Sequence, residues 1–179
     1  YSLVAAPLVV AGFLSYFPPA DVRTELVRFL SIGGLSGRQE IWLRALAALE
    51  DFSYTGVGLG QVGQVLPALY PYDLLPGQSY QHAHNVYLQV GLDLGMAAQI
   101  GYISLWILVL SLLIDTLRRP ASPTIRTLAL GSLGASITLL VNGLVDAAMW
   151  GTKLSFLPWL LFALVVQLSV AVSADDDAE

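Results

Sequence analysis

The sequence predicts an all-α fold: a polytopic helical membrane protein with a large extracytoplasmic loop that contains short amphipathic helices. Three observations predict this class. Charged residues make up 12% of the 179 positions and hydrophobic residues 56%, whereas soluble domains carry about 25% charged residues. The mean hydropathy is +0.69. Several apolar runs also approach the roughly 20 residues that a helix needs to cross a bilayer.

Residues 1–17 are predicted to form a truncated transmembrane helix. The run from Leu3 to Phe17 is apolar and uncharged, but it is shorter than a full span. Pro18 and Pro19 end it, because neither proline can donate a backbone hydrogen bond. Since the chain begins with Tyr1 inside this apolar run, we expect a C-terminal fragment of a longer membrane protein.

Residues 18–96 are predicted to form the loop outside the membrane, with short helices at the interface. One is expected over Asp21–Leu30, with its apolar residues on one face. A second begins at Ser36, where Gln39 three residues later completes a capping box, and ends at Glu50-Asp51. From Tyr54 to Gln64 we expect loop and turn, and Tyr70-Pro71-Tyr72 and Pro76-Gly77 continue this irregular region.

The glycines of this loop do not form a nucleotide cradle. Gly56, Gly58, Gly60 and Gly63 have the spacing G-x-G-x-G-x-x-G, and no strand–helix unit surrounds them, as a dinucleotide fingerprint requires. We expect them to allow close packing of the backbone where a side chain would clash.

Residues 97–172 are predicted to form three transmembrane helices, after a helix from Asn85 to Leu94. The three apolar runs are Ala97–Ile114, Thr127–Val145 and Leu154–Val172. The polar connection Asp115–Arg126 holds three arginines, which places it in the cytoplasm. The turn at Asp146–Lys153 and residues 18–96 then face outward, and the acidic tail, residues 173–179, is cytoplasmic.

Both histidines of the chain, His82 and His84, lie where the loop gives way to apolar sequence. A neutral imidazole can accept a proton from a hydroxyl group, because its ordinary pKa of about 6.5 suits that task at neutral pH. Two interface histidines bound to water or backbone are the alternative. The Asn85 amide either holds a substrate oxygen or caps the helix that follows.

An H-x-H pair can also bind zinc or copper. A catalytic zinc ion would need a third ligand, and the possible donors are Asp73, Asp93 and Asp146. Because there is no second histidine cluster, we expect neither a metal nor another cofactor. The absence of cysteine excludes disulfides and thiolate chemistry, and no basic patch indicates nucleic acid.

Arg38 is the candidate anion-binding residue. A guanidinium offers a rigid fork of donors that fits phosphate, and the start of a helix also favours an anion. The alternative is a surface arginine stacked on Trp42, which lies four residues later on the same helical face. Asp146 ends the third apolar run, where it is either exposed to water or paired with Arg38 or a histidine.

These residues resemble the O-antigen ligase and O-antigen polymerase family of bacterial envelope glycosyltransferases. The resemblance covers roughly Leu35 to Leu168 and includes the Gly91–Gly95 segment. It rests on three motifs, which are Ser36-Gly37-Arg38 followed by Trp42, Gly56-Val57-Gly58-Leu59-Gly60, and His82-Ala83-His84-Asn85-Val86-Tyr87-Leu88.

The resemblance implies a multi-pass protein of the bacterial inner membrane with a large periplasmic loop. Such proteins transfer a glycan from undecaprenyl diphosphate to a glycan or lipid acceptor, with inversion and without metal or nucleotide. It implies that Arg38 contacts the donor diphosphate and that His84 serves the acceptor hydroxyl. We further expect substrate binding by His82, Asn85, Trp42 and Asp146. The family has more spans, so the fragment is expected to be inactive alone.

Two other classes remain open. Related folds have been assigned to solute uptake, for example of bicarbonate. A transporter predicts polar residues within the membrane runs, where Gln99 and Asn142 are the clear candidates. A structural membrane subunit would tolerate alanine at both histidines.

Overall fold

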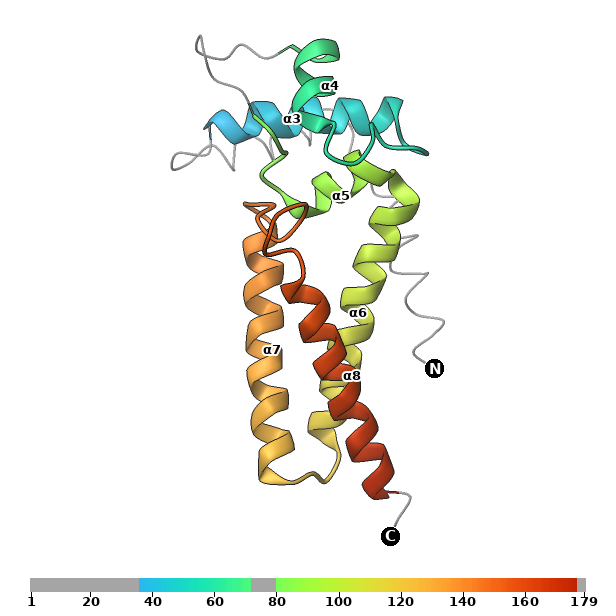
Figure 1. Ribbon diagram of the computed structural model, residues 1–179, viewed down its shortest axis with the longest axis vertical. Helices are drawn as coiled ribbons and strands as arrows, with labels where there is room; N and C mark the ends of the chain where they lie inside the picture. The colour runs from blue at the N-terminus through green and yellow to red at the C-terminus, as the bar shows by residue number, and fades with distance from the viewer. Residues whose placement is uncertain (1–35, 72–79, 177–179) are drawn as a thin grey trace, which may run out of the picture. The chain divides into compact units, whose positions relative to one another are not determined.

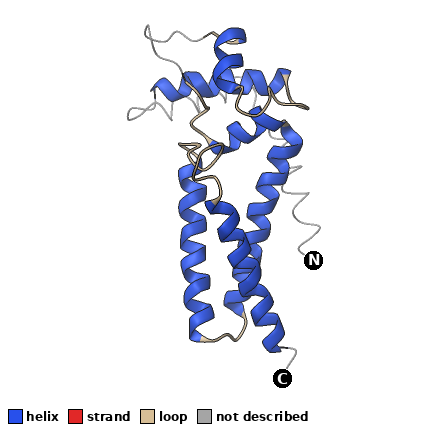
Figure 2. Cartoon of the chain, viewed as in Figure 1, coloured by secondary structure: helices blue, strands red, loops and turns tan. Residues whose placement is uncertain are grey.

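The computed structural model describes residues 36–71 and 80–176. Within these ranges every regular element is a helix and no strand occurs, as Figure 2 shows. The predicted all-α membrane fold is therefore confirmed. The helices are labelled in Figure 1 and comprise α3 (Ser36–Asp51), α4 (Val62–Leu69), α5 (Val86–Leu94), α6 (Met96–Arg118), α7 (Pro123–Gly143) and α8 (Leu157–Asp176). The helix expected at Asp21–Leu30 and the run Leu3–Phe17 lie outside the described residues.

Three helices are long and apolar enough to cross a membrane. They are α6 with 23 residues, α7 with 21 residues, and 18 residues of α8, Leu157–Ala174. They match the three predicted runs, although their ends differ. Helix α6 continues to Arg118, four residues past the predicted Ile114.

The polar connection between α6 and α7 is shorter than predicted. Ser122 caps α7 by accepting a hydrogen bond from the backbone N–H of Ile125 at 3.4 Å, and Pro123 opens the helix. Proline suits this first position because its missing N–H would have no partner there. Arg118 and Arg126 therefore lie within helices, and the predicted connection Asp115–Arg126 was wrong in its bounds.

Helix α4 was not predicted, and the expectation of loop and turn from Tyr54 to Gln64 was wrong from Val62 onward. Gly63 and Pro67 are poor helix formers, yet both lie within α4. Burial of Val62 and Leu66, four residues apart on one face, stabilises the helix against these propensities. They join a core whose other members come from α3, α5 and the segment before α5, namely Ala45, Ala48, Leu49, Ala83 and Leu92.

The chain forms two compact units, which are described separately. The described part of the first unit comprises residues 36–71, 80–84 and 88–101, and that of the second comprises residues 85–87 and 102–176. In the second unit α7 packs against α8 (Figure 1). Small buried residues of α7, such as Ala129, Ser132 and Ser136, allow close approach of the helices.

Candidate active site

The central feature of the first unit is the turn that carries both histidines. Ala83, between them, is fully buried. Its backbone N–H donates to Oε1 of Gln89 at 2.7 Å, and its carbonyl oxygen accepts from Nε1 of Trp42 at 2.9 Å. Two buried side chains, one from α5 and one from α3, thus hold a single residue by both of its backbone polar groups.

His84 has a φ of +49°, and among the described residues it is the one non-glycine residue with positive φ. This left-handed conformation costs a residue with a Cβ about 1 kcal/mol, and such outliers cluster at active sites. The His84 N–H donates to Nδ1 of His82 at 3.2 Å. Because Nδ1 of His82 accepts, that ring carries its proton on Nε2 when it is neutral.

Aromatic contacts fix the imidazole rings further. The rings of His82 and His84 lie with centroids 4.0 Å apart. Tyr80 meets the His84 ring edge-on at 5.8 Å. Both histidines are only partly buried, so the two rings are ordered by neighbours and still reachable by a substrate.

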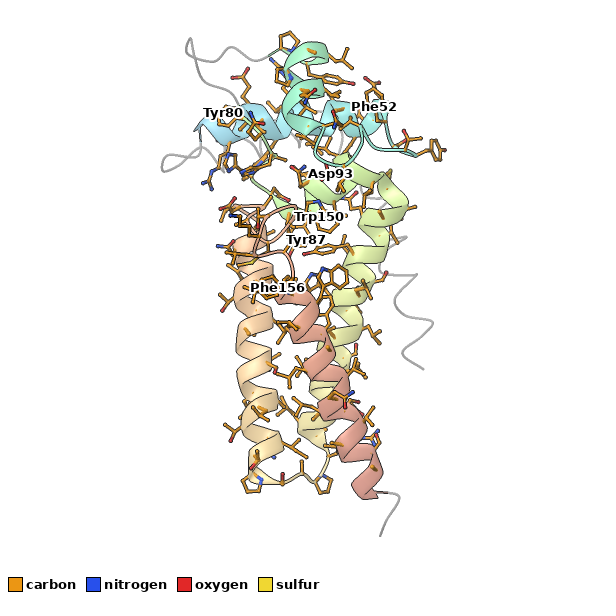
Figure 3. The ribbon with its side chains drawn as sticks, viewed as in Figure 1. Phe52, Tyr80, Tyr87, Asp93, Trp150 and Phe156 are labelled. Carbon is orange, nitrogen blue, oxygen red and sulfur yellow. The ribbon has the colours of Figure 1, made fainter. Side chains whose placement is uncertain are left out.

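A buried pair on α5, Gln89 and Asp93, supports the turn. They are 4% and 3% exposed, and Nε2 of Gln89 donates to Oδ1 of Asp93 at 3.1 Å. The same carboxylate oxygen accepts from the backbone N–H of Gly60 at 3.3 Å. Figure 3 labels Asp93 on α5. The sequence analysis missed this role, although two polar residues four apart in an apolar helix were a signal.

The backbone at Gly56 packs closely against the end of α5, as expected for these glycines, whereas a Cβ at Gly60 would meet no atom within 4 Å. Gly56 has a φ of +65°, and a Cβ there would lie 2.6 Å from the carbonyl oxygen of Leu92. The backbone N–H of Val57 donates to that oxygen at 2.6 Å, and the N–H of Met96 donates to the carbonyl of Ser53 at 2.7 Å. These contacts need a residue without a side chain at Gly56.

Arg38 and Trp42 lie one turn apart on α3. Arg38, the third residue of the helix, is partly buried, while Trp42 is 8% exposed. The predicted α3, from Ser36 to Asp51, is confirmed. Because Trp42 holds Ala83, Arg38 lies about 6 Å along the helix axis from the residue that anchors the histidine turn.

Asn85 and Asp146 belong to the second unit. Nδ2 of Asn85 donates to the carbonyl of Leu144 at 3.0 Å, so this amide ties the start of α5 to the end of α7. Oδ1 of Asp146 accepts from the N–H of Ala147 at 2.7 Å. Both Asp146 and Asn142 line a small cleft, together with Val86, Tyr102, Trp106, Leu139, Gly143, Met149 and Pro158.

Tyr87 also ties α5 to α7 within the second unit. Its hydroxyl donates to the carbonyl of Leu140 at 2.9 Å. Burial, with a smaller contribution from nearby Tyr102, raises the pKa of Tyr87 to about 12. The phenol therefore remains a donor throughout the physiological range. Figure 3 labels Tyr87 and Trp150, which belong to the same unit.

Asp73, Asp93 and Asp146 are the carboxylates that could complete a metal site with the two histidines. Oδ1 of Asp93 already accepts two hydrogen bonds. Asp73 lies outside the described residues. Asp146 belongs to the second unit. The expectation of a site without metal stays a prediction.

The helices define a multi-pass membrane protein in which a histidine turn is held by buried polar side chains. The family model described as O-antigen ligase matches residues 1–103, more than half of the chain. The chain belongs to the O-antigen ligase family, as the sequence resemblance predicted. This is a family of glycosyltransferase type with a role in polysaccharide assembly. No curated protein and no solved structure matches the chain significantly.

Proposed function

We propose that this protein transfers a glycan from an undecaprenyl-diphosphate-linked donor to an acceptor hydroxyl during assembly of a surface polysaccharide. The reaction takes place on the periplasmic face of the bacterial plasma membrane. The observation that carries the proposal is the positive φ of His84 in a turn whose neighbour Ala83 is anchored on both sides. Strain of this kind persists only where the surroundings enforce it.

His84 is the group that serves the acceptor. Its neutral imidazole takes the proton of the acceptor hydroxyl as that oxygen forms a bond to the anomeric carbon of the donor. The bond between the anomeric carbon and the diphosphate oxygen breaks, and the diphosphate leaves with the electron pair. Direct displacement from the opposite face inverts the configuration at the anomeric carbon.

Arg38 stabilises the leaving diphosphate. A glycosyl diphosphate is already activated, so the protein has mainly to orient the reactants and stabilise the charge that develops on the leaving group. The guanidinium provides two parallel donors for phosphate oxygens, and its place in the first turn of α3 adds the favourable helix dipole. No metal or nucleotide is required for these steps.

Four other predicted residues complete the proposal. His82 orients the N–H of His84 and presents its Nε2 to substrate. Trp42 acts through Ala83, because its indole N–H is already engaged. Asn85 and Asp146 carry an amide and a carboxylate, and sugar hydroxyls are suitable partners for both groups.

The test uses His84→Ala and Arg38→Lys in the gene of the host bacterium, followed by gel analysis of its surface polysaccharide. We expect the long glycan ladder to disappear, or to remain unattached, at unchanged protein level. Gln64→Ala and Arg126→Lys are matched controls, because both residues are exposed and lie outside the proposed site. An unchanged ladder in both site variants would contradict the proposal and favour a transporter or a structural subunit.

A further inference from the structure

We infer that Gln89 is a positioning residue for His84: together with Asp93 it fixes the backbone of Ala83 and so places the imidazole. The inference rests on the proposed function, because it adds a residue to the same site. Gln89 does not touch the reacting atoms. It acts through the turn that carries His84.

The first step is the anchoring of Ala83. Its N–H bonds to Gln89 at 2.7 Å and its carbonyl to Trp42 at 2.9 Å, and both bonds are buried. A residue held by both of its backbone groups cannot rotate either peptide plane freely. Since the peptide between Ala83 and His84 is one of these planes, the two bonds fix the position of the His84 N–H and Cα, from which the side chain extends.

The second step is the orientation of the Gln89 amide. Only one orientation satisfies both of its contacts, with Oε1 accepting from Ala83 and Nε2 donating to Asp93. The reversed amide would place its NH₂ group against the N–H of Ala83 and its oxygen against a carboxylate. Asp93 therefore keeps Gln89 ready to accept from Ala83.

The third step is the support of Asp93 itself. Its Oδ1 also accepts from the N–H of Gly60, at 3.3 Å, in the glycine segment that packs on α5. A continuous set of hydrogen bonds thus runs from Gly60 through Asp93 and Gln89 to Ala83. The glycine segment and the histidine turn are linked through one buried amide.

The decisive variant is Gln89→Glu, which keeps the size of the side chain. One glutamate oxygen can still accept from Ala83, but the other faces the Asp93 carboxylate, and like charges repel at this distance. We expect the turn to shift and the rate of glycan transfer to fall about tenfold or more. Gln89→Met removes both hydrogen bonds without adding a charge and is expected to give a similar loss.

Adding Asp93→Asn to Gln89→Glu should restore part of the transfer. The asparagine removes one of the two facing negative charges, and its NH₂ can donate to the second glutamate oxygen. The bond from Gly60 is then lost, because it uses the same atom of residue 93, so the rescue is expected to be incomplete. Gln64→Glu adds the same charge at an exposed position of α4 and is the control, with no expected effect.

A double-mutant cycle with His84→Ala distinguishes positioning from general support. If Gln89 acts through His84, Gln89→Glu should change the residual rate of the His84→Ala protein less than about twofold, whereas independent effects would multiply. With Arg38→Lys the loss should multiply, because Arg38 serves the donor. Rates are measured as formation of finished polysaccharide in membrane vesicles of the host, and apparent Tm is measured on each purified variant.

The outcomes separate the two claims. A tenfold loss in Gln89→Glu, measured below the Tm of each variant, with partial rescue by Asp93→Asn and no further loss beside His84→Ala, supports the inference. A loss that multiplies with His84→Ala overturns the inference and leaves the proposed function intact. Normal transfer by His84→Ala alone overturns the proposed function and the inference with it.

Discussion

Replacing Gly56 by alanine should separate the glycine segment from α5, whereas the same change at Gly60 should not. Both glycines have positive φ, +65° and +71°, so both substitutions carry a similar conformational cost of about 1 kcal/mol. They differ in surroundings. A Cβ at Gly60 meets no atom within 4 Å, whereas one at Gly56 lies 2.6 Å from the oxygen of Leu92 and 2.7 Å from the nitrogen of Gly95.

The difference in stability can be worked out from these contacts. Ordinary contact begins at 3.4 Å, so the segment at Gly56 must withdraw by 3.4 − 2.6, about 0.8 Å. That displacement breaks the bond from Val57 to Leu92 and the neighbouring bond from Met96 to Ser53. Each such bond contributes about 1 kcal/mol to the free energy of unfolding. Gly56→Ala should therefore be about 2 kcal/mol less stable than Gly60→Ala.

Thermal unfolding of the purified protein in detergent, followed by tryptophan fluorescence, measures this difference. For a chain of this size, 2 kcal/mol corresponds to a shift of about 6 °C in Tm. The Gly56→Ala protein should unfold at the lower temperature. Equal Tm values for the two variants would refute the close approach of the glycine segment to α5.

Two further predictions concern single hydrogen bonds. Trp42→Phe leaves the buried carbonyl of Ala83 without its donor, which should lower the free energy of unfolding by about 2 kcal/mol and reduce glycan transfer. Thermal unfolding measures the first effect and gel analysis of the polysaccharide ladder the second. An unaltered ladder would contradict the role of Trp42. Burial, and to a smaller extent nearby Tyr102, raises the pKa of Tyr87 to about 12, above the ordinary value of about 10. The contribution of the protonated Tyr87 phenol to stability is therefore fully present below pH 10 and is lost as pH rises toward 12. The Tm of the unchanged protein should fall between pH 9 and pH 11, and it should fall less in the Tyr87→Phe protein. An identical fall in both proteins would contradict the raised pKa of Tyr87.

Much of the membrane part could be predicted from the sequence, because apolar runs of this length have few other uses. The ends of the helices could not. Apolar patterning does not report that Ser122 caps α7 or that Pro123 opens it, and these two residues bring Arg126 into the helix. Helix α4 was missed for a related reason: Gly63 and Pro67 oppose it locally, and only burial of Val62 and Leu66 in the core outweighs them.

The histidines and the arginine of the candidate site could be predicted from their residue types, but the residues that hold the histidine turn in place could not. A pair of histidines beside an asparagine is visible in the sequence, since these are rare groups in an apolar chain. The role of Gln89 depends on its contact with the backbone of Ala83 six residues earlier. Any residue could have supplied that N–H, so residue types could not reveal the partner. Trp42 is expected from the sequence to bind substrate, but its indole N–H donates to the backbone carbonyl of Ala83.

The measurement that tests the central claim most directly is the amount of lipid-linked glycan in host membranes that carry the His84→Ala protein. If His84 serves the acceptor hydroxyl, this variant slows transfer at the step after the donor has formed. Lipid-linked glycan should then accumulate while finished surface polysaccharide falls, at unchanged protein level. Normal polysaccharide together with an unchanged pool of lipid-linked donor would contradict the assignment of His84 and with it the proposed glycan transfer.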